Sequence, residues 1–421
     1  MKLNKKPKLI ILGIIIVALV GGGVFWWWLV DNKAKQSQNN QNEISNNQQA
    51  GERIIYEEQE LISRKDAKPN NSYTINHKIY SLDLNGKEKL LYSFIDDQSG
   101  SAIYITKDNK IYITVKSKNS YILLDKDGRD ITATDNLFLK DKDLSVDRFL
   151  PFKSGKKVIY GLDVDSETKE GDNHNLYIKD LDTGKVEEIK NADFPKGVET
   201  IEPVGWSKDE NSFYAELVGW EGLEFSGLWR VNAVDKTVKS IKSVEKTAIW
   251  NLRVYPELDL ALGVEGTTNE ELGMGGDIVA PNTLFLIDLN NDTKKQIATT
   301  DKNLLTGFYL SSNQKEVLYQ EREYKVEENT AKMTKITTKI INLDANEVKK
   351  IPIDKEIVYC SSDLKTVLVQ MGGEGLSEKH EYNLTKTIDG IVVTKLKDNQ
   401  TSYQDWKKGE KVYEFLGFLK Y

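Results

Sequence analysis

Carboxylates that could bind a metal ion are concentrated in one polar segment of the chain. Asp163, Asp165 and Asp172 lie in this segment, with Glu167 among them. Alternating carboxylates can ligate Ca²⁺, which takes roughly six to eight oxygen ligands. The spacing lacks the glycine and the closing glutamate of a helix-loop-helix calcium site. The sequence leaves two interpretations open, an ion site and a solvated acidic loop, so any metal is unknown.

A second group of candidate residues combines aromatic rings with carboxylates. Trp220, Glu221 and Glu224 lie between glycines, a mixture suited to stacking on a sugar ring or holding a peptide. Packing against a neighbouring element is the structural alternative. Asp277 follows a glycine-rich run that contains no lysine and opens no helix, so a phosphate cradle is not expected there. Glu374 completes the candidate binding residues.

Residues for nucleophilic or zinc-dependent catalysis are sparse. The chain has three histidines, His77, His174 and His380, and it contains neither a Gly-x-Ser-x-Gly nor a His-Glu-x-x-His motif. We therefore expect a protein without catalytic residues or a cofactor. The alternative is a carbohydrate- or peptidoglycan-active hydrolase or lyase that uses a pair of acidic residues, because glycosidases need two carboxyl groups about 5 to 10 Å apart.

The elements that must position these residues form a repeat. An apolar run, an acidic or amide residue and a turn recur along the chain at steps of 42 to 56 residues. The copies run through Asp83, Asp125, Asp180, Asn232, Asp288, Asn342 and Lys395. A period of this size is typical of propellers and other repeat arrays.

A second hairpin pattern precedes most of these copies. Polar turns followed by strand-like residues occur at 206–215, 310–319 and 360–369. Each repeat therefore supplies four strands, A to D, which is the content of one propeller blade. The sequence predicts an all-β fold, a seven-bladed β-propeller, with six or eight blades as alternatives. Alternating aromatic residues in 411–419 predict a final strand that closes the fold.

The A-to-B turns resemble the Ser-Pro-Asp-Gly turn of TolB-like and WD-repeat-like β-propellers. Ser207-Lys208-Asp209-Glu210 and Ser362-Asp363-Leu364-Lys365 keep the serine and the aspartate but lack the proline and the glycine. The resemblance covers roughly residues 52 to 421. It implies a propeller fold and a binding role, and no catalytic residue is carried over with it.

The amino-terminal segment predicts a membrane anchor. Residues 9–30 are 22 residues without a charge, enough to cross a hydrocarbon core of about 30 Å as a helix. Residues 1–8 contain four lysines, and positive charge is retained on the cytoplasmic side. We therefore expect a single-pass, uncleaved anchor with the carboxy-terminal body outside the cytoplasm. A cleaved signal peptide is the alternative.

Residues 31–51 predict a polar tether between the anchor and the repeats. The segment is rich in asparagine and glutamine and has almost nothing apolar to bury. The domain organisation expected from the sequence is therefore a basic tail at 1–8, an anchor at 9–30, a linker at 31–51 and an extracytoplasmic propeller at 52–421.

The connections between strands B and C are expanded in the third to seventh repeats, at 163–174, 218–227, 264–281, 320–334 and 372–389. Together these segments contain 19 acidic and 6 basic residues, a net charge of −13, whereas the whole chain carries −7. The sequence thus predicts an acidic face that binds an envelope protein or polymer and not nucleic acid, and the negative charge favours a cationic partner. Acidic loops that serve only solubility are the alternative.

Overall fold

The structure is a computed structural model, and it describes residues 52–65, 72–96, 102–105, 109–115, 120–132, 144–152, 156–162, 176–180, 182–189, 200–218, 227–244, 247–268, 278–327, 330–371, 380–399, 409 and 411–420. Residues Arg53–Lys420 form one compact unit. The expected anchor and tether lie outside the described residues. Within the described part of the chain, no helix is both long and apolar enough to cross a membrane.

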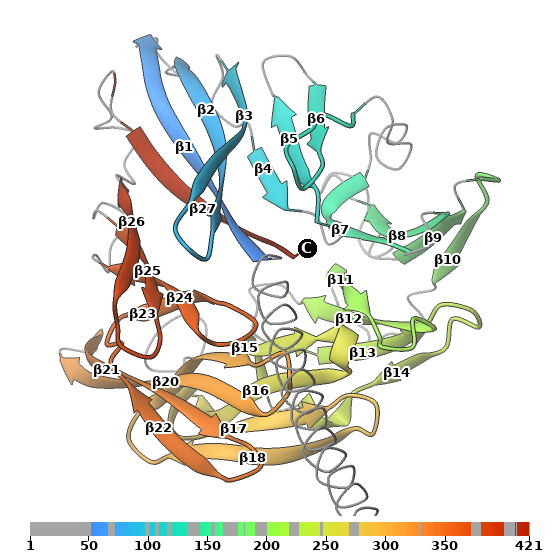
Figure 1. The fold of residues 1–421 in the computed structure, drawn as a ribbon. Helices are drawn as coiled ribbons and strands as arrows, with labels where there is room; N and C mark the ends of the chain where they lie inside the picture. Colours follow the sequence, from blue (N-terminus) through green and yellow to red (C-terminus); the bar gives the residue numbers. More distant parts are fainter. Residues whose placement is uncertain are drawn as a thin grey trace, which may run out of the picture. The chain divides into compact units, whose positions relative to one another are not determined.

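Seven antiparallel sheets make up the described strands, and they follow one another in chain order (Figure 1). The first has the order β27-β1-β2-β3, from Lys411–Lys420, Glu52–Lys65, Ser72–Asp83 and Glu88–Asp96. The second contains β4 (Ala102–Ile105), β5 (Ile111–Val115) and β6 (Ser120–Leu124). The third contains β7 (Leu144–Pro151), β8 (Lys157–Leu162), β9 (Leu176–Asp180) and β10 (Val186–Ile189).

The remaining four sheets each have four strands. They are β11 (Thr200–Trp206), β12 (Ser212–Val218), β13 (Gly227–Asn232) and β14 (Val238–Ser240); β15 (Thr247–Tyr255), β16 (Leu260–Thr268), β17 (Ile278–Asp288) and β18 (Thr293–Thr300); β19 (Leu304–Leu310), β20 (Glu316–Glu327), β21 (Thr330–Asn342) and β22 (Glu347–Ile351); and β23 (Glu356–Cys360), β24 (Thr366–Met371), β25 (His380–Lys386) and β26 (Val392–Asn399). Two short 3₁₀ helices, η4 (Lys242–Val244) and η5 (Pro256–Leu258), connect strands.

The six four-stranded sheets are the blades of a β-propeller, the fold that the sequence predicted. The first strands of neighbouring sheets contact one another, as β7 does with β11 and β19 with β23. The expectation of seven blades is wrong: the described strands form six four-stranded blades, the number that the sequence left as an alternative, and β4, β5 and β6 form a separate three-stranded sheet. The repeat pattern could not show this difference because it marks the third strand and its turn, and it carries no information about the fourth strand.

Apolar side chains pack between consecutive sheets, because each sheet is covered on both sides by its neighbours. One core cluster joins the third and fourth sheets through residues such as Ile159, Ile178 and Phe213. Another joins the fifth and sixth through Leu284, Leu305 and Val317. Burial of apolar surface between blades therefore holds neighbouring repeats together, at about 25 cal/mol per Å² removed from water.

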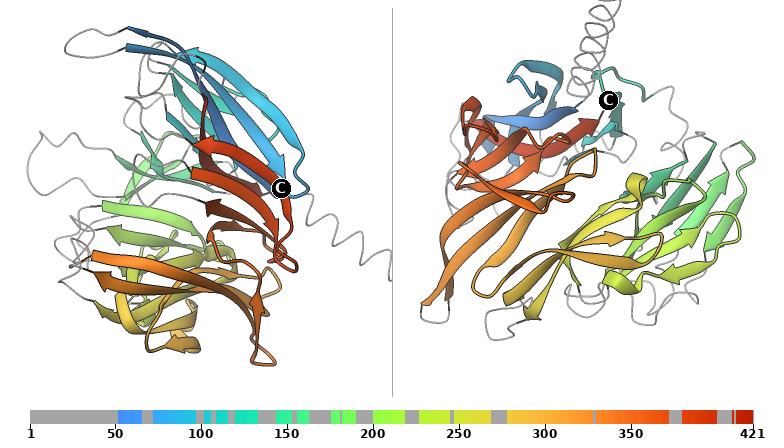
Figure 2. Two further views of the ribbon diagram at one scale, coloured as in Figure 1. Left: turned by 90° about the vertical axis from the view of Figure 1, so that its left-hand side faces the viewer. Right: turned by 60° about the horizontal axis from the view of Figure 1, so that its bottom comes forward.

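Two faces of the propeller follow from the antiparallel order. We call the end where the first strand turns into the second, and the third into the fourth, the A–B face. The opposite end, where the second strand leads to the third, is the B–C face. The far ends of β1–β2 and β20–β21 both point to the B–C face (Figure 2, left).

Two of the expected B–C segments are different in the structure. Residues 320–334 were expected to form a loop, but β20 and β21 pair as far as Glu327 and Thr330, so the insertion is a lengthened hairpin. Residues 372–389 include strand β25 and the following turn, so the seventh copy of the repeat was placed one strand too late. Val392-Val393 in β26 resembles the repeat pattern more closely than the polar strand β25 does, which explains the error.

The ring closes through its last strand. As expected, the segment 411–419 is a strand, β27, and it takes the first-strand position beside β1. The hydroxyl group of Tyr413 donates to a carboxylate oxygen of Glu58 at 2.9 Å, and the Lys411 ammonium lies 3.0 Å from the same side chain. The amino-terminal and carboxy-terminal ends of the propeller are thereby joined within one sheet.

Buried amide side chains join consecutive blades through the backbone. Asn282 donates to the carbonyl of Asn303 at 2.7 Å and accepts from the amide of Leu305 at 3.0 Å. One blade later, Gln320 donates to the carbonyl of Lys355 at 2.7 Å and accepts from the amide of Ile357 at 3.1 Å. The two side chains make the same contact with the next sheet. Each bonds the backbone on both sides of the first residue of that sheet's first strand, Leu304 of β19 or Glu356 of β23.

We predict that Gln320→Glu lowers the free energy of unfolding by about 3 kcal/mol, because a fully buried carboxylate would face a carbonyl oxygen without a donor. Gln296→Glu, on the exposed edge strand β18, is the matched control and should change stability little. Urea unfolding followed by circular dichroism measures both. Equal stability of the two variants would show that the Gln320 joint contributes nothing.

Candidate functional site

The eight binding residues predicted from the sequence lie outside the described part of the chain. They are Asp163, Asp165, Asp172, Trp220, Glu221, Glu224, Asp277 and Glu374. Their participation in binding therefore stays a prediction. The strands that flank their segments are described, and β8, β12, β16 and β24 each run toward the B–C face before those segments begin. The topology thus brings these connections to one face of the propeller.

The described part of the B–C face is built from hairpins. The β1–β2 pairing extends to Lys65 opposite Ser72, and the β16–β17 pairing extends to Thr268 opposite Ile278. The hairpins β1–β2 and β20–β21 each pair twelve residues of their first strand, more than the nine of β16–β17. The face therefore carries regular two-stranded ribbons in places where the sequence suggested loops.

Several carboxylates of the B–C segments have lysine partners on a neighbouring strand. Glu323 lies 2.8 Å from the Lys335 ammonium, and Glu321 lies 2.5 Å from that of Lys339. Glu265 pairs with Lys294. Since Lys335, Lys339 and Lys294 fall outside the segments in which charge was counted, the value of −13 overstates the negative charge of the described part of this face.

The A–B face contains the serine turns that suggested the family resemblance. The Ser207 hydroxyl donates to Asp209 at 2.6 Å and accepts from the Ser212 amide at 3.3 Å. The turns that begin at Ser311 and Ser361 repeat both contacts. At the position of the family glycine, the non-glycine residues Glu210, Gln314 and Leu364 have φ between 57° and 61°. The turn geometry is thus kept although glycine is absent.

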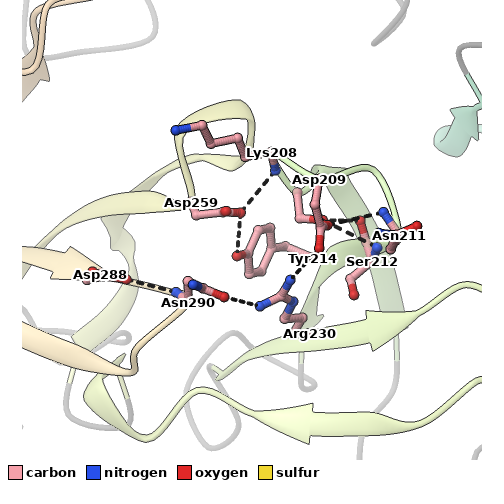
Figure 3. Close-up of polar contacts among 10 residues, drawn as sticks. Lys208, Asp209, Asn211, Ser212, Tyr214, Arg230, Asp259, Asp288 and Asn290 are labelled. Carbon is pink, nitrogen blue, oxygen red and sulfur yellow. Dashed lines mark hydrogen bonds and ion pairs between the residues drawn. The ribbon is translucent and has the colours of Figure 1, made fainter.

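A cluster of polar residues on the A–B face links the fourth and fifth sheets (Figure 3). Tyr214 donates to Asp259 at 2.9 Å, and the same carboxylate oxygen accepts from the Lys208 amide at 3.1 Å. Arg230 donates to the side-chain oxygen of Asn290 at 2.7 Å and lies 3.5 Å from Asp209. Tyr214 and Arg230 lie on β12 and β13. Asp259 lies in the turn between β15 and β16, and Asn290 lies in the turn between β17 and β18.

The electrostatics of this cluster favour a structural role. A hydrogen bond from Ser207 is the main reason that the pKa of Asp209 lies below its ordinary value, and the charge of Arg230 acts in the same direction. Burial, together with the neighbouring Asp259 carboxylate, raises the pKa of Tyr214 far above its ordinary value. The phenol therefore stays protonated and acts as a hydrogen-bond donor. The cluster fastens two blades.

A buried histidine–carboxylate pair lies between β1 and β2. The Nδ1 atom of His77 is 2.5 Å from a carboxylate oxygen of Glu57, whose other oxygen accepts from Gln59 at 2.8 Å. The imidazole ring stacks on Phe94 with a centroid distance of 4.5 Å. An imidazole oriented in this way can act as a general base. Its Nε2 atom is buried without a hydrogen-bond partner, however, so it cannot reach a substrate in this conformation.

Glu58 lies on the opposite side of the same strand. Burial raises the pKa of its carboxyl group, but hydrogen bonds from Lys78, Lys411 and Tyr413 outweigh burial, and the pKa lies below its ordinary value. The side chain is therefore ionised at neutral pH and joins three strands of the first blade. The functional consequence is indirect, because ring closure keeps both faces of the propeller in place.

Metal binding finds no support in the described residues, which contain no group of three or more His, Cys, Asp and Glu side chains arranged around a common point. The polar residues that matter structurally, above all His77, Gln320 and Asn282, were not found by motif analysis. A usable signal was present: each is a polar residue within an otherwise strand-like apolar segment, and such a residue needs a partner when it is buried.

Comparison with known proteins gave no match to a family model and no match to a curated protein. Among solved structures, TolB from Acinetobacter baumannii is similar with 15% identity and a TM-score of 0.33, over 72% of this chain and 63% of that one. A prolyl endopeptidase is similar with 11% identity and a TM-score of 0.48, over 85% of this chain and 50% of that one.

An oligogalacturonate lyase in complex with manganese is similar with 11% identity and a TM-score of 0.45, over 75% of this chain and 86% of that one. The chain thus spans less than two thirds of the length of the TolB and endopeptidase chains. All three identities are 15% or lower and all three TM-scores are below 0.5. The conclusion that this chain is an all-β propeller therefore depends on its own sheet order.

We predict that Gln314→Gly raises the free energy of unfolding by about 0.5 kcal/mol. A side chain at φ 61° costs about 1 to 2 kcal/mol, part of which is offset by the greater freedom of glycine in the unfolded chain. Leu364→Gly is the matched control, because Leu364 has the same backbone conformation but is buried in a core cluster. It should lower the free energy of unfolding by about 2 kcal/mol or more. A thermal melt that ranks the variants in the opposite order contradicts this account of the turn.

We predict that Glu58→Gln lowers the free energy of unfolding by about 2 kcal/mol at pH 7, because charge-assisted bonds to two lysines are lost. Since the folded-state pKa of Glu58 is lowered, its contribution is present above the ordinary value of 4.5 and is lost as the pH falls through the folded-state pKa. The difference between parent and variant should therefore shrink in acid. Urea unfolding at a series of pH values measures it, with the exposed Glu347→Gln as control. A difference that is independent of pH would contradict the assignment.

Proposed function

We propose that this protein is a non-catalytic binding platform, a β-propeller that is tethered to the outside of a cell membrane by residues 9–30 and binds an envelope protein or polymer through its B–C face. The observation that supports this proposal best is the ribbon β20–β21. We use the name ribbon for Glu323–Glu327 and Thr330–Thr337, the part of the hairpin that extends beyond its sheet.

The ribbon leaves backbone groups available at both edges. β19 pairs with β20 only as far as Arg322, and β22 pairs with β21 only from Thr338. Beyond these residues, each described strand of the ribbon is paired only with the other. Such an edge can add a strand from a partner, with main-chain hydrogen bonds giving affinity and side-chain pockets giving specificity. A rigid scaffold that presents such an edge is suited to binding an extended segment.

The other B–C connections support the same face. The topology brings the segments that contain Trp220, Glu224 and Asp277 to the end of the propeller from which the ribbon extends. A partner bound along the ribbon could thus also contact these segments. An acidic composition in the remaining segments favours a partner with positive charge at its rim.

The proposal is tested by shortening the ribbon in the full chain. Glu323 and Lys335 are directly paired, so replacing residues 324–334 by Asn-Gly should close the hairpin with a two-residue turn and leave the sheet intact. We expect an unchanged melting temperature and an affinity for the partner that is weaker by about tenfold.

The partner is first identified with a photo-crosslinking amino acid at Glu323 in intact cells. The same amino acid at Asp344, an exposed residue in a turn of the A–B face, is the matched control. A partner captured from Glu323 and not from Asp344, and lost on shortening the ribbon, supports the platform. Equal capture from both positions, or full affinity without the ribbon, contradicts it. Turnover of an envelope glycan by the parent protein would favour the carbohydrate-active alternative.

A further inference from the structure

One turn of the A–B face carries more exposed apolar residues than the other described turns, in which Val186 is 46% and Val348 is 53% exposed. The turn between β25 and β26 exposes Ile388 by 70%, Ile391 by 60% and Val392 by 43%. We call these three residues the apolar tip. In each corresponding turn one residue has a positive φ, as Gly390 has in this one. The residue that follows it is polar in the other sheets: Lys87, Arg129, Lys185, Thr237, Thr293 and Glu347. Ile391 alone among these described turn residues is apolar.

The backbone of the turn explains how these side chains are exposed. The Asp389 carboxylate accepts from the Ile391 amide at 3.0 Å, and the Gly390 amide donates to the Lys386 carbonyl at 3.0 Å. Gly390 has φ 70°, a conformation that reverses the chain within a few residues. The turn is therefore a regular, fully bonded one, and the exposure of its isoleucines does not result from irregular structure. Three adjacent exposed apolar residues indicate a contact surface.

A second sheet presents an apolar residue on the same face. Val234, in the turn between β13 and β14, is 80% exposed. It has the same position in its turn as Ile388, two residues before the left-handed residue. The two turns belong to the fourth and the seventh sheet, which are not neighbours in the chain order. A flat surface is able to contact both turns at once.

The path of the chain identifies a flat occupant. β1 is a second strand, and Arg53 at its beginning is paired with Asp83, the first residue of the β2–β3 turn. The chain therefore enters the propeller on the A–B face, the face that carries the apolar tip. The 21 residues from Asp31 to Gly51 precede this point. A polar chain of that length has a root-mean-square span of about 25 Å. A membrane that holds residues 9–30 would thus stay close to the A–B face.

Basic residues flank the apolar tip. The Thr387 amide donates to the carbonyl of Lys365 at 2.9 Å, which places the two turns of the seventh sheet side by side. Gly86 packs against Val393, so the turn that contains Lys87 lies next to β26. Lys365 and Lys87 are both exposed. Asp363 accepts from a backbone amide of its own turn and lies 3.7 Å from the Lys365 ammonium, and Asp389 accepts from the Ile391 amide. The exposed Glu88 follows Lys87. Lysines and carboxylates thus surround the apolar tip, and its exposed isoleucines are the part that suits a lipid interface.

We propose that the A–B face is the membrane-facing side of the propeller and that the apolar tip, Ile388, Ile391 and Val392, inserts into the lipid interface. The proposal rests on the membrane tethering stated under the proposed function and adds an orientation to it. The B–C face then points away from the membrane.

The test uses the full chain reconstituted into phosphatidylcholine vesicles that contain phosphatidylglycerol. Cys360 is the sole cysteine and is buried, so a Cys360→Ala background allows one fluorescent label at Ile391→Cys. The matched control is the label at Lys335→Cys, an exposed position on the B–C face. Lipids brominated on their acyl chains quench a label that reaches the interface.

We expect quenching at position 391 that is several-fold stronger than at position 335, and a large decrease when Ile388→Ser is added. Equal quenching at the two positions, or no effect of Ile388→Ser, overturns the proposal. Trp26, Trp27 and Trp28 report on the anchor separately. Tryptophan quenching by the brominated lipids is measured in the parent chain and in a variant in which these three residues are replaced by Phe, and the difference is the quenching of the anchor tryptophans. Quenched anchor tryptophans without quenching at 391 overturn the orientation alone. Unquenched anchor tryptophans overturn the membrane tethering and the orientation together.

Discussion

Pairing between the last strand and the first described strand is the constraint on which the propeller depends. Each blade buries its two faces against its neighbours, and only the closed ring gives the first and last sheets a neighbour on both sides. β27 completes the first sheet, and the core cluster between the first and last sheets contains Tyr413 of β27 together with Ile54 and Leu384. Glu58 adds a specific bond, because its carboxylate reaches β27 and β2 at once. The two faces of the propeller exist as surfaces because this closure holds.

The repeat could be predicted from the sequence because turn chemistry is local. An aspartate or asparagine that accepts from backbone amides two to four residues later marks nearly every third-strand turn, as Asp83, Asp125 and Asp288 do. The serine turns are local as well, and their geometry is kept by Ser207, Ser311 and Ser361. The seventh copy shows the limit of this reasoning. In β25 the residue before the turn is Lys386, so the pattern shifted to the more apolar strand β26.

The contacts between blades could not be predicted in the same way, because they join residues that are far apart in the sequence. Arg230 and Asn290 are 60 residues apart, and nothing near either residue indicates the other. The same reason explains the error in the charge count. Glu321 and Glu323 were counted with their own segment, whereas the lysines that pair with them, Lys339 and Lys335, lie on the returning strand outside it. For the eight predicted binding residues, topology supports a common face, and their side-chain arrangement stays a prediction.

The two proposals fit together through the direction of one strand. Because β1 enters the first sheet as its second strand, Arg53 lies at the A–B face, whereas the ribbon extends from the B–C face. If β1 had been a first or third strand, the chain would enter on the B–C face, and the same tether would hold the ribbon toward the membrane. Under the two proposals, the strand order β27-β1-β2-β3 therefore assigns membrane tethering and partner binding to opposite faces. β1 can take the second position because β27, from the carboxy-terminal end of the chain, takes the first. Ring closure therefore also determines at which face the chain enters the propeller, and with it the face that we propose for partner binding.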